Sequence, residues 1–185
     1  MKRFVIAITG ASGVCYAKRL FDVLQPQAEL HLIISERGGE LLNLELGLTS
    51  KYFAKENVTV HKNSKINASI ASGSFPVDGM VVIPASMGTL GRIAAGTSES
   101  LIERAADVAL KERNQLILVP RETPFSQIHL KNMLTLDRAG AMILPANPGF
   151  YQNPKSVDDL VDFVVARVLD QLNVAHHLTQ PYKPE

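Results

Sequence analysis

The sequence predicts a single α/β domain with a doubly wound, mostly parallel sheet. Short, almost continuously apolar runs alternate along the chain with segments of helical period. Such runs are typical of parallel strands that are buried on both faces. Because a crossover between parallel neighbours needs a helix, the alternation places helices on both faces of the sheet. With 185 residues and 46% hydrophobic content, the chain is long enough for one well-filled core.

The expected elements follow from these two periods. Strands are predicted at residues 4–9, 30–35, 80–84, 116–120 and 141–145. Helices are predicted at residues 13–24, 38–46, 91–111, 127–139 and 157–172. Residues 51–76 are polar and weakly periodic, so we expect irregular chain there, with one candidate strand at 58–61. From residue 174 onward there is no periodic apolar face, and we expect a loose tail in which His176 and His177 are solvated.

Composition argues against several classes of protein. The net charge of +1 gives no general attraction to nucleic acid or to anionic lipid. The first residues lack the features of a signal peptide, and no stretch approaches the roughly 18 apolar residues that would span a membrane. The single cysteine, Cys15, cannot form an internal disulfide, and the five histidines lack the spacing of a metal site. We therefore expect a soluble cytoplasmic protein without a bound metal.

Small and polar residues follow the first strand, at the edge where sheets of this class bind ligands. The sequence TGASG, residues 9–13, offers glycines for close backbone approach and helix amides that favour an anion such as a phosphate. A tight turn with Ser12 as a helix cap is an equally good interpretation. The turn has neither the GxGxxG spacing nor a Walker ending, so alone it is a weak signal.

Two further strand ends carry hydroxyl groups. After the strand at 80–84, Ser86, Gly88 and Thr89 offer hydroxyls and bare amides that suit a phosphate or an uncharged ring edge. Ordinary helix capping explains the same residue types, but the density of glycine favours a ligand. Ser35, at the end of the second strand, is on its own most simply a turn or a cap.

Charged and aromatic residues follow the last two strands. Arg121 and Glu122 stand side by side, where a guanidinium can bind a phosphate and a carboxylate can move a proton. A surface ion pair between them is the alternative. The loop at 145–154 presents Phe150, which we expect to pack on the core, and Tyr151.

Residues 100–113, SLIERAADVALKER, predict an amphipathic helix. Arg104 and Lys111 are seven residues apart and share one face of it. Taken alone, this face is a solvated basic edge with acidic helical partners at Glu103, Asp107 and Glu112.

Taken together, these motifs resemble the UbiX-type flavin prenyltransferases. The motifs are TGASG, SLIERAADVALKER, LILVPRETPFSQIHLKNML, GAMILPANPGFY and VDDLVDFVVARVLDQL, in this order. The resemblance covers about residues 3–173. It implies a flavodoxin-like or Rossmann-like fold, an FMN-binding domain at residues 1–173, and a tail at 174–185 that acts as a lid. It also implies an active site at the subunit contacts of a homododecamer.

The resemblance further implies the residues of the site. FMN would be bound by Gly10, Ala11, Ser12, Ser35, Ser86, Met87, Gly88, Thr89, Arg104 and Arg121. Dimethylallyl phosphate would be bound by Tyr151 and Arg167, and the reacting centre would be surrounded by Glu45, Arg104, Lys111 and Glu122. Some relatives carry an aromatic residue in the tail, often Trp, that covers the site; this chain has no Trp, and Tyr182 is the candidate substitute.

The implied reaction joins a dimethylallyl group to reduced FMN without a metal ion and supplies prenylated FMN to a partner decarboxylase. The leaving phosphate needs positive groups where its charge grows, which assigns this role to Lys111, Arg121 and Arg167, with Tyr151 as a hydrogen-bond donor. Proton transfer is assigned to Glu122, a supporting role to Glu45, and the steering of the flavin nitrogen to Ser12.

Other functions are disfavoured or left open. A flavin-dependent cysteine decarboxylase would carry a PxMNxxMW motif and a His in the first helical region, and this chain has neither. An NAD-linked dehydrogenase would carry GxGxxG. A non-catalytic flavin carrier remains open, as does the choice between a monophosphate and a diphosphate donor.

Overall fold

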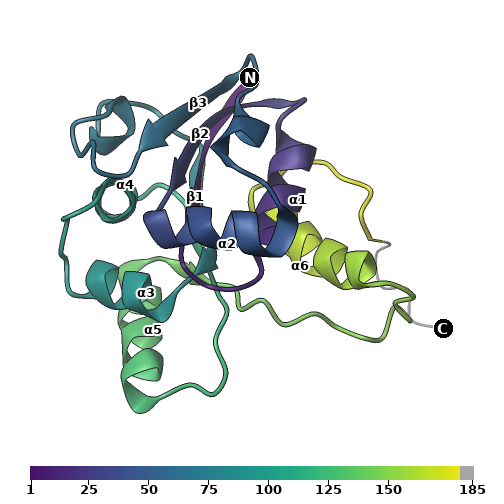
Figure 1. Ribbon diagram of the computed structural model, residues 1–185. Coiled ribbons are helices and arrows are strands. Elements are labelled where there is room, and N and C mark those ends of the chain that lie inside the picture. Colours follow the sequence, from purple (N-terminus) through teal and green to yellow (C-terminus); the bar gives the residue numbers. More distant parts are fainter. Residues whose placement is uncertain (180–185) are drawn as a thin grey trace.

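A fully parallel six-stranded sheet forms the centre of the computed structural model, which describes residues 1–179 (Figure 1). The strands are β1 (Lys2–Ile8), β2 (Ala28–Ile34), β3 (Val58–Lys62), β4 (Gly79–Ala85), β5 (Leu116–Pro120) and β6 (Met142–Ile143). Their order is β3-β2-β1-β4-β5-β6, so the chain builds outward from β1 in one direction and from β4 in the other. The doubly wound, Rossmann-like class predicted from the sequence is confirmed.

Helices cover both faces of this sheet. They are α1 (Val14–Leu24), α2 (Glu36–Leu46), α3 (Met87–Ala94), α4 (Leu101–Lys111), α5 (Gln127–Ala139) and α6 (Val157–Gln171), with short 3-10 turns at η1 (Ser50–Phe53) and η2 (Ser69–Ala71). One core joins the sheet to α1, α6 and Leu42 of α2, and a second core joins the other face to α3, α4 and α5. Figure 1 accordingly shows α3 beside α5 and α1 beside α6, on opposite sides of the molecule.

Most expected elements form, with two corrections. The candidate strand at 58–61 is β3, whereas the strand expected at 141–145 is reduced to the two residues of β6. The single helix expected at 91–111 is wrong, because α3 and α4 are separate helices. Gly96 between them has a φ of 71°, a left-handed conformation that ends a helix readily because glycine has no Cβ.

Glu103 fixes the break between α3 and α4. Its carboxylate accepts hydrogen bonds from the amides of Glu99 and Ser100 and from Arg92 of α3, and the residue is only 2% exposed. Burial acts to raise the pKa of Glu103, but the bonds from Arg92 and from the Ser100 amide outweigh it and hold that pKa below its usual value. Glu103 is therefore a buried structural carboxylate, which corrects its interpretation as a solvated partner on the helix surface.

A histidine pair joins the edge strand β3 to the sheet. Nδ1 of His31 on β2 lies 2.8 Å from Nε2 of His61 on β3, and the two rings are stacked. The other nitrogen of His31 lies 3.2 Å from Glu29, which in turn binds Arg3 of β1. Because one ring must donate and the other accept, the contact needs a proton on only one of the two facing nitrogens.

Acid should weaken the fold through this pair. Burial lowers the pKa of His31 below 6.5 despite the opposing effect of Glu29, and burial together with the charge of His31 lowers the pKa of His61. The unfolded chain therefore binds more protons as the pH falls below about 6.5, so stability decreases in that direction. Lys65 adds a further positive charge that disfavours protonation of His61.

We expect the free energy of unfolding to fall between about pH 7 and about pH 5, and to fall less steeply in His31→Gln. Urea unfolding followed by circular dichroism at each pH measures this slope. If the free energy of unfolding depends on pH as steeply in His31→Gln as in the starting protein, the histidine pair is not the source of that dependence. Carboxylates with lowered pKa values, such as Glu29, act in a separate window below their ordinary value of 4.5.

Candidate functional site

Most of the expected site residues gather at the carboxyl edge of the sheet, where the strand order reverses between β1 and β4. The loop after β1 carries Gly10, Ala11 and Ser12, and the loop after β2 carries Ser35. The turn after β4 carries Ser86, Met87, Gly88 and Thr89, and the loop after β5 carries Arg121 and Glu122. The topology thus brings together segments that are up to about a hundred residues apart in the chain.

Thr9 joins the loop after β1 to the turn after β4. Its hydroxyl donates to the carbonyl of Pro84 at 2.7 Å and accepts from the amide of Ser86 at 2.8 Å. The residue is 1% exposed, so both bonds lie in the interior. Sequence reasoning passed over Thr9 in favour of its glycine and serine neighbours. The signal that could have found it is a hydroxyl residue at the last position of an otherwise apolar strand.

A carboxylate from α2 occupies the N-terminus of α1. Glu45 Oε2 accepts hydrogen bonds from the amides of Gly13 at 3.0 Å and Val14 at 3.2 Å. Gly13 is the N-cap residue, with a φ of 101°, so Ser12 is not the cap. The preference of these amides for an anion is therefore met by Glu45 of the chain itself.

Both serines that follow β2 and β4 cap the next helix. The Oγ of Ser35 accepts from the amide of Gly38 at 3.0 Å, and the Oγ of Ser86 accepts from the amide of Thr89 at 3.3 Å. Thr89 is buried and its hydroxyl lies 3.0 Å from that of Ser86, whereas Gly88 is exposed. In the first turn of α3 the leading amides have no acceptor within the helix, so they can donate to a ligand.

Arg121 reaches from the loop after β5 to the loop after β1. Its Nε donates to the carbonyl of Ser12 at 3.0 Å, a contact that uses one of its three nitrogens. The carboxylate of Glu122 instead accepts from the amide of Thr123 at 3.0 Å. Arg121 and Glu122 thus turn to separate partners, and the surface ion pair considered for them does not form.

Lys111 lies at the amino edge of the sheet, where the strands begin, opposite the carboxyl edge. It is the last residue of α4, which returns the chain to the start of β5, and it pairs with Glu112 beside the loop at Gly73. Arg104, one turn into α4, pairs with Asp107 at 2.8 Å. A single protomer therefore does not bring Lys111 to Arg121.

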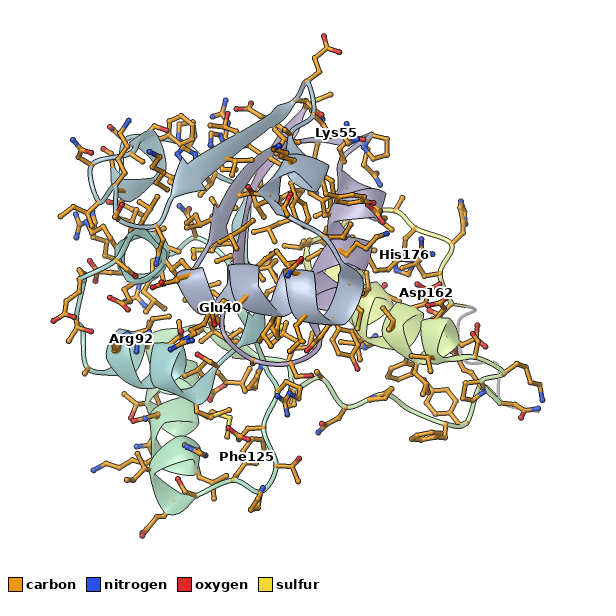
Figure 2. All side chains as sticks on the ribbon, viewed as in Figure 1. Glu40, Lys55, Arg92, Phe125, Asp162 and His176 are labelled. Carbon is orange, nitrogen blue, oxygen red and sulfur yellow. The ribbon has the colours of Figure 1, made fainter. Side chains whose placement is uncertain are left out.

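Tyr151 and Arg167 form a third group, beside α6. They line an open groove of about 660 Å³ together with Phe163, Asp170 and His176. The rings of Tyr151 and Phe163 meet edge to face, with their centroids 5.8 Å apart. Figure 2 shows His176 on the α6 side of the molecule and Arg92 of α3 on the other side. This groove is thus separate from the α3 part of the candidate site.

The described part of the tail is not loose. Val174 and Leu178 pack against the core of α1 and α6, and Lys2 donates to the carbonyl of Asn173 at 2.8 Å. The side chain of His176 is 9% exposed and lies 3.0 Å from Asp170, which corrects its interpretation as solvated. The rest of the tail, including Tyr182, lies outside the described residues, so the lid stays a prediction.

Within residues 1–179, no helix is long and apolar enough to cross a membrane. In the same part of the chain, no group of three or more His, Cys, Asp or Glu side chains is placed to hold a metal ion.

Comparison with known proteins identifies the class and then the family. A family model described as "Flavoprotein" matches residues 1–169, so the chain belongs to the flavoproteins. The flavin prenyltransferase UbiX of Methanocaldococcus jannaschii is 47% identical over 176 residues, which cover 95% of this chain and 96% of that protein. Within the flavoproteins, the chain is therefore a member of the UbiX-type flavin prenyltransferase family, as its motifs indicate.

Two solved structures share the fold closely. A dodecameric FMN-dependent UbiX-like decarboxylase from Escherichia coli O157:H7 is 42% identical with a TM-score of 0.95, and the match covers 98% of this chain and 100% of that one. AnUbiX (PadA1), in complex with FMN and dimethylallyl pyrophosphate, is 39% identical with a TM-score of 0.95, and the match covers 100% and 98% of the two chains.

Gly13→Ala should destabilise the protein by about 1–2 kcal/mol, because a φ of 101° strains any L side chain. The added Cβ would also lie 3.1 Å from the ring of Tyr16. Gly39→Ala is the matched control, since its Cβ would meet nothing closer than 3.9 Å and alanine favours a helix. Urea unfolding of both variants tests the difference; equal stability of the two would contradict it.

Proposed function

We propose that this chain transfers a dimethylallyl group from dimethylallyl phosphate to reduced FMN, and that a partner decarboxylase uses the prenylated FMN. The observation that carries the proposal is 47% identity, over nearly the full length of both chains, to a protein named as a flavin prenyltransferase. A neighbour of the same fold was solved with FMN and dimethylallyl pyrophosphate. The single free cysteine suits the reducing cytoplasm, which we propose as the location.

The groups at the carboxyl edge of the sheet suit FMN. The exposed turn at Gly88 offers backbone amides, and Arg121 keeps two nitrogens for a ligand after its contact with Ser12. We assign FMN binding to Gly10, Ala11, Ser12, Ser35, Ser86, Met87, Gly88, Thr89, Arg104 and Arg121. When bound, reduced FMN supplies the nucleophilic ring, and the residues of this chain position it and exclude water.

The remaining roles concern the donor. Tyr151 and Arg167 hold the donor phosphate, and Lys111, Arg121 and Arg167 stabilise the negative charge that grows on it as it leaves. In this proposal the three cationic side chains stabilise the leaving phosphate without the help of a metal ion. Glu122 moves a proton near the phosphate, Glu45 supports the first turn through the amides of Gly13 and Val14, and Ser12 steers the flavin nitrogen.

Neighbouring subunits complete the site in this proposal. One protomer holds the proposed groups in separate places: the carboxyl edge with Arg121, the opposite edge with Lys111, and the groove with Arg167. Contacts between copies of the chain can bring these surfaces together. The dodecameric UbiX-like structure from E. coli supports such an assembly, and we propose a homododecamer.

Anaerobic incubation of the purified protein with reduced FMN and dimethylallyl phosphate should give a flavin heavier by one five-carbon unit, together with free phosphate. Mass spectrometry of the extracted flavin measures this, with the diphosphate donor in a parallel reaction. Lys111→Ala and Glu122→Gln should each lower turnover by about 100-fold while FMN still binds. Bound but unmodified FMN with both donors would favour a flavin carrier instead.

Two inactive variants should restore activity in mixed oligomers. If Lys111 acts on a site whose Arg121 belongs to another subunit, co-assembly of Lys111→Ala with Arg121→Gln leaves about a quarter of the sites intact. Separately purified variants that are combined without subunit exchange provide the control. Turnover that stays at the level of the single variants after exchange would place both residues in one subunit.

A further inference from the structure

One carboxylate joins the proposed donor-binding arginine to the tail. Asp170 Oδ2 accepts from Nη1 of Arg167 at 2.9 Å, and its Oδ1 lies 3.0 Å from Nε2 of His176. Arg167 and Asp170 are three residues apart on α6, whereas His176 lies beyond the end of that helix. The two oxygens of Asp170 thus hold groups from two different segments.

The tautomer of His176 follows from its second contact. The amide of Leu178 donates to His176 Nδ1 at 3.3 Å, so Nδ1 acts as an acceptor and carries no proton. A neutral ring then has its proton on Nε2 and donates it to Asp170. Hydrogen bonds therefore run from the Leu178 amide through His176 to Asp170, and the guanidinium of Arg167 donates to the same carboxylate from the other side.

The tail holds His176 in place. Leu178 and Val174 pack on the core of α1 and α6, and the carbonyls of Leu172 and Asn173 accept from Lys2 of β1. His176 is mostly covered, with 9% of its side chain exposed. Asp170 is consequently fixed on one side by a ring that has little freedom to move.

An exposed i,i+3 ion pair alone would not fix Arg167. Such pairs contribute little, because both side chains lose rotamer freedom to form them, and Arg167 and Asp170 are about half exposed. With Asp170 held by His176, the carboxylate becomes a fixed acceptor for Nη1. Nε and Nη2 of Arg167 then remain for a bidentate contact with a phosphate.

We propose that Asp170 and His176 are positioning residues that orient Arg167 toward the phosphate of the prenyl donor. This inference rests on the proposed function, in which Arg167 binds that phosphate. Neither residue touches the reacting atoms, so both act on the affinity for the donor and not on the bonds that form or break. The described tail then contributes to the donor site through His176, which acts on the ligand only by way of Asp170 and Arg167.

The test is a double-mutant cycle on donor affinity. Dimethylallyl phosphate is titrated into protein loaded with oxidised FMN, which cannot turn over, and the change in flavin absorbance or fluorescence gives Kd. His176→Phe keeps a ring of similar size and the formal charge but removes both hydrogen bonds. It should raise Kd by about 3- to 10-fold, and in the Arg167→Gln background it should raise Kd by less than about 2-fold.

Two further variants sharpen the result. His176→Gln retains an N–H that can reach Asp170 and should keep Kd within about 2-fold of the starting protein. His177→Phe places the same ring at the exposed neighbouring position, which lines the same groove but has no hydrogen bond to Asp170, so it should raise Kd by less than His176→Phe does. The affinity for FMN should be unchanged in all of them.

The outcomes separate this inference from the proposed function. If Arg167→Gln weakens donor binding but His176→Phe does not, the positioning role is wrong and the proposed function stands. If His176→Phe weakens binding equally with and without Arg167, the tail acts generally and the positioning role is also wrong. If Arg167→Gln leaves Kd unchanged, or the starting protein binds no donor, the proposed role of Arg167 itself fails.

Discussion

Burial of the central strands on both faces is the constraint on which the rest of the structure depends. All residues of β4 and β5, and the last five of β1, are buried, so these strands have no face on which a polar side chain could meet water or a ligand. Polar groups are therefore confined to the strand ends, where Thr9, Ser86 and Arg121 follow one another across the sheet. The order of the strands thus decides which loops can share a ligand.

The same constraint explains why the proposed chemistry is dispersed in one protomer. Crossover helices run antiparallel to the strands, so a residue at the end of such a helix lies at the edge of the sheet away from the loops. Lys111 is in this position, while Arg167 lies on α6, the final helix, which packs on the face of α1. An assembly in which helix surfaces of one copy meet the strand-end loops of another would use this arrangement without any change of fold.

Local periodicity allowed most of the fold to be predicted, because apolar runs and helical faces are properties of neighbouring residues. The failures concern contacts between distant segments. The break after Gly96 is the local exception, because Ser100 and Glu103 form a capping box that marks a helix start in the sequence, although the burial of Glu103 does not follow from that pattern. Glu45 reaches Gly13 across 32 positions, and Arg167 was found only through family resemblance, since alone it resembles any surface charge. Such pairings leave no periodic trace in a sequence.

Thr9 shows how a residue can shape a site that it never touches. Its one hydroxyl proton is committed to Pro84 and an acceptor position to Ser86, and its burial keeps it from any ligand. Thr9 therefore fixes the spacing between the loop after β1 and the turn that begins α3, although it lies in the interior below both. Attempts to engineer the protein for an altered flavin would gain from varying the exposed loop positions and holding Thr9 constant. A serine at this position would retain the hydroxyl group, whereas a valine would remove it and release both loops.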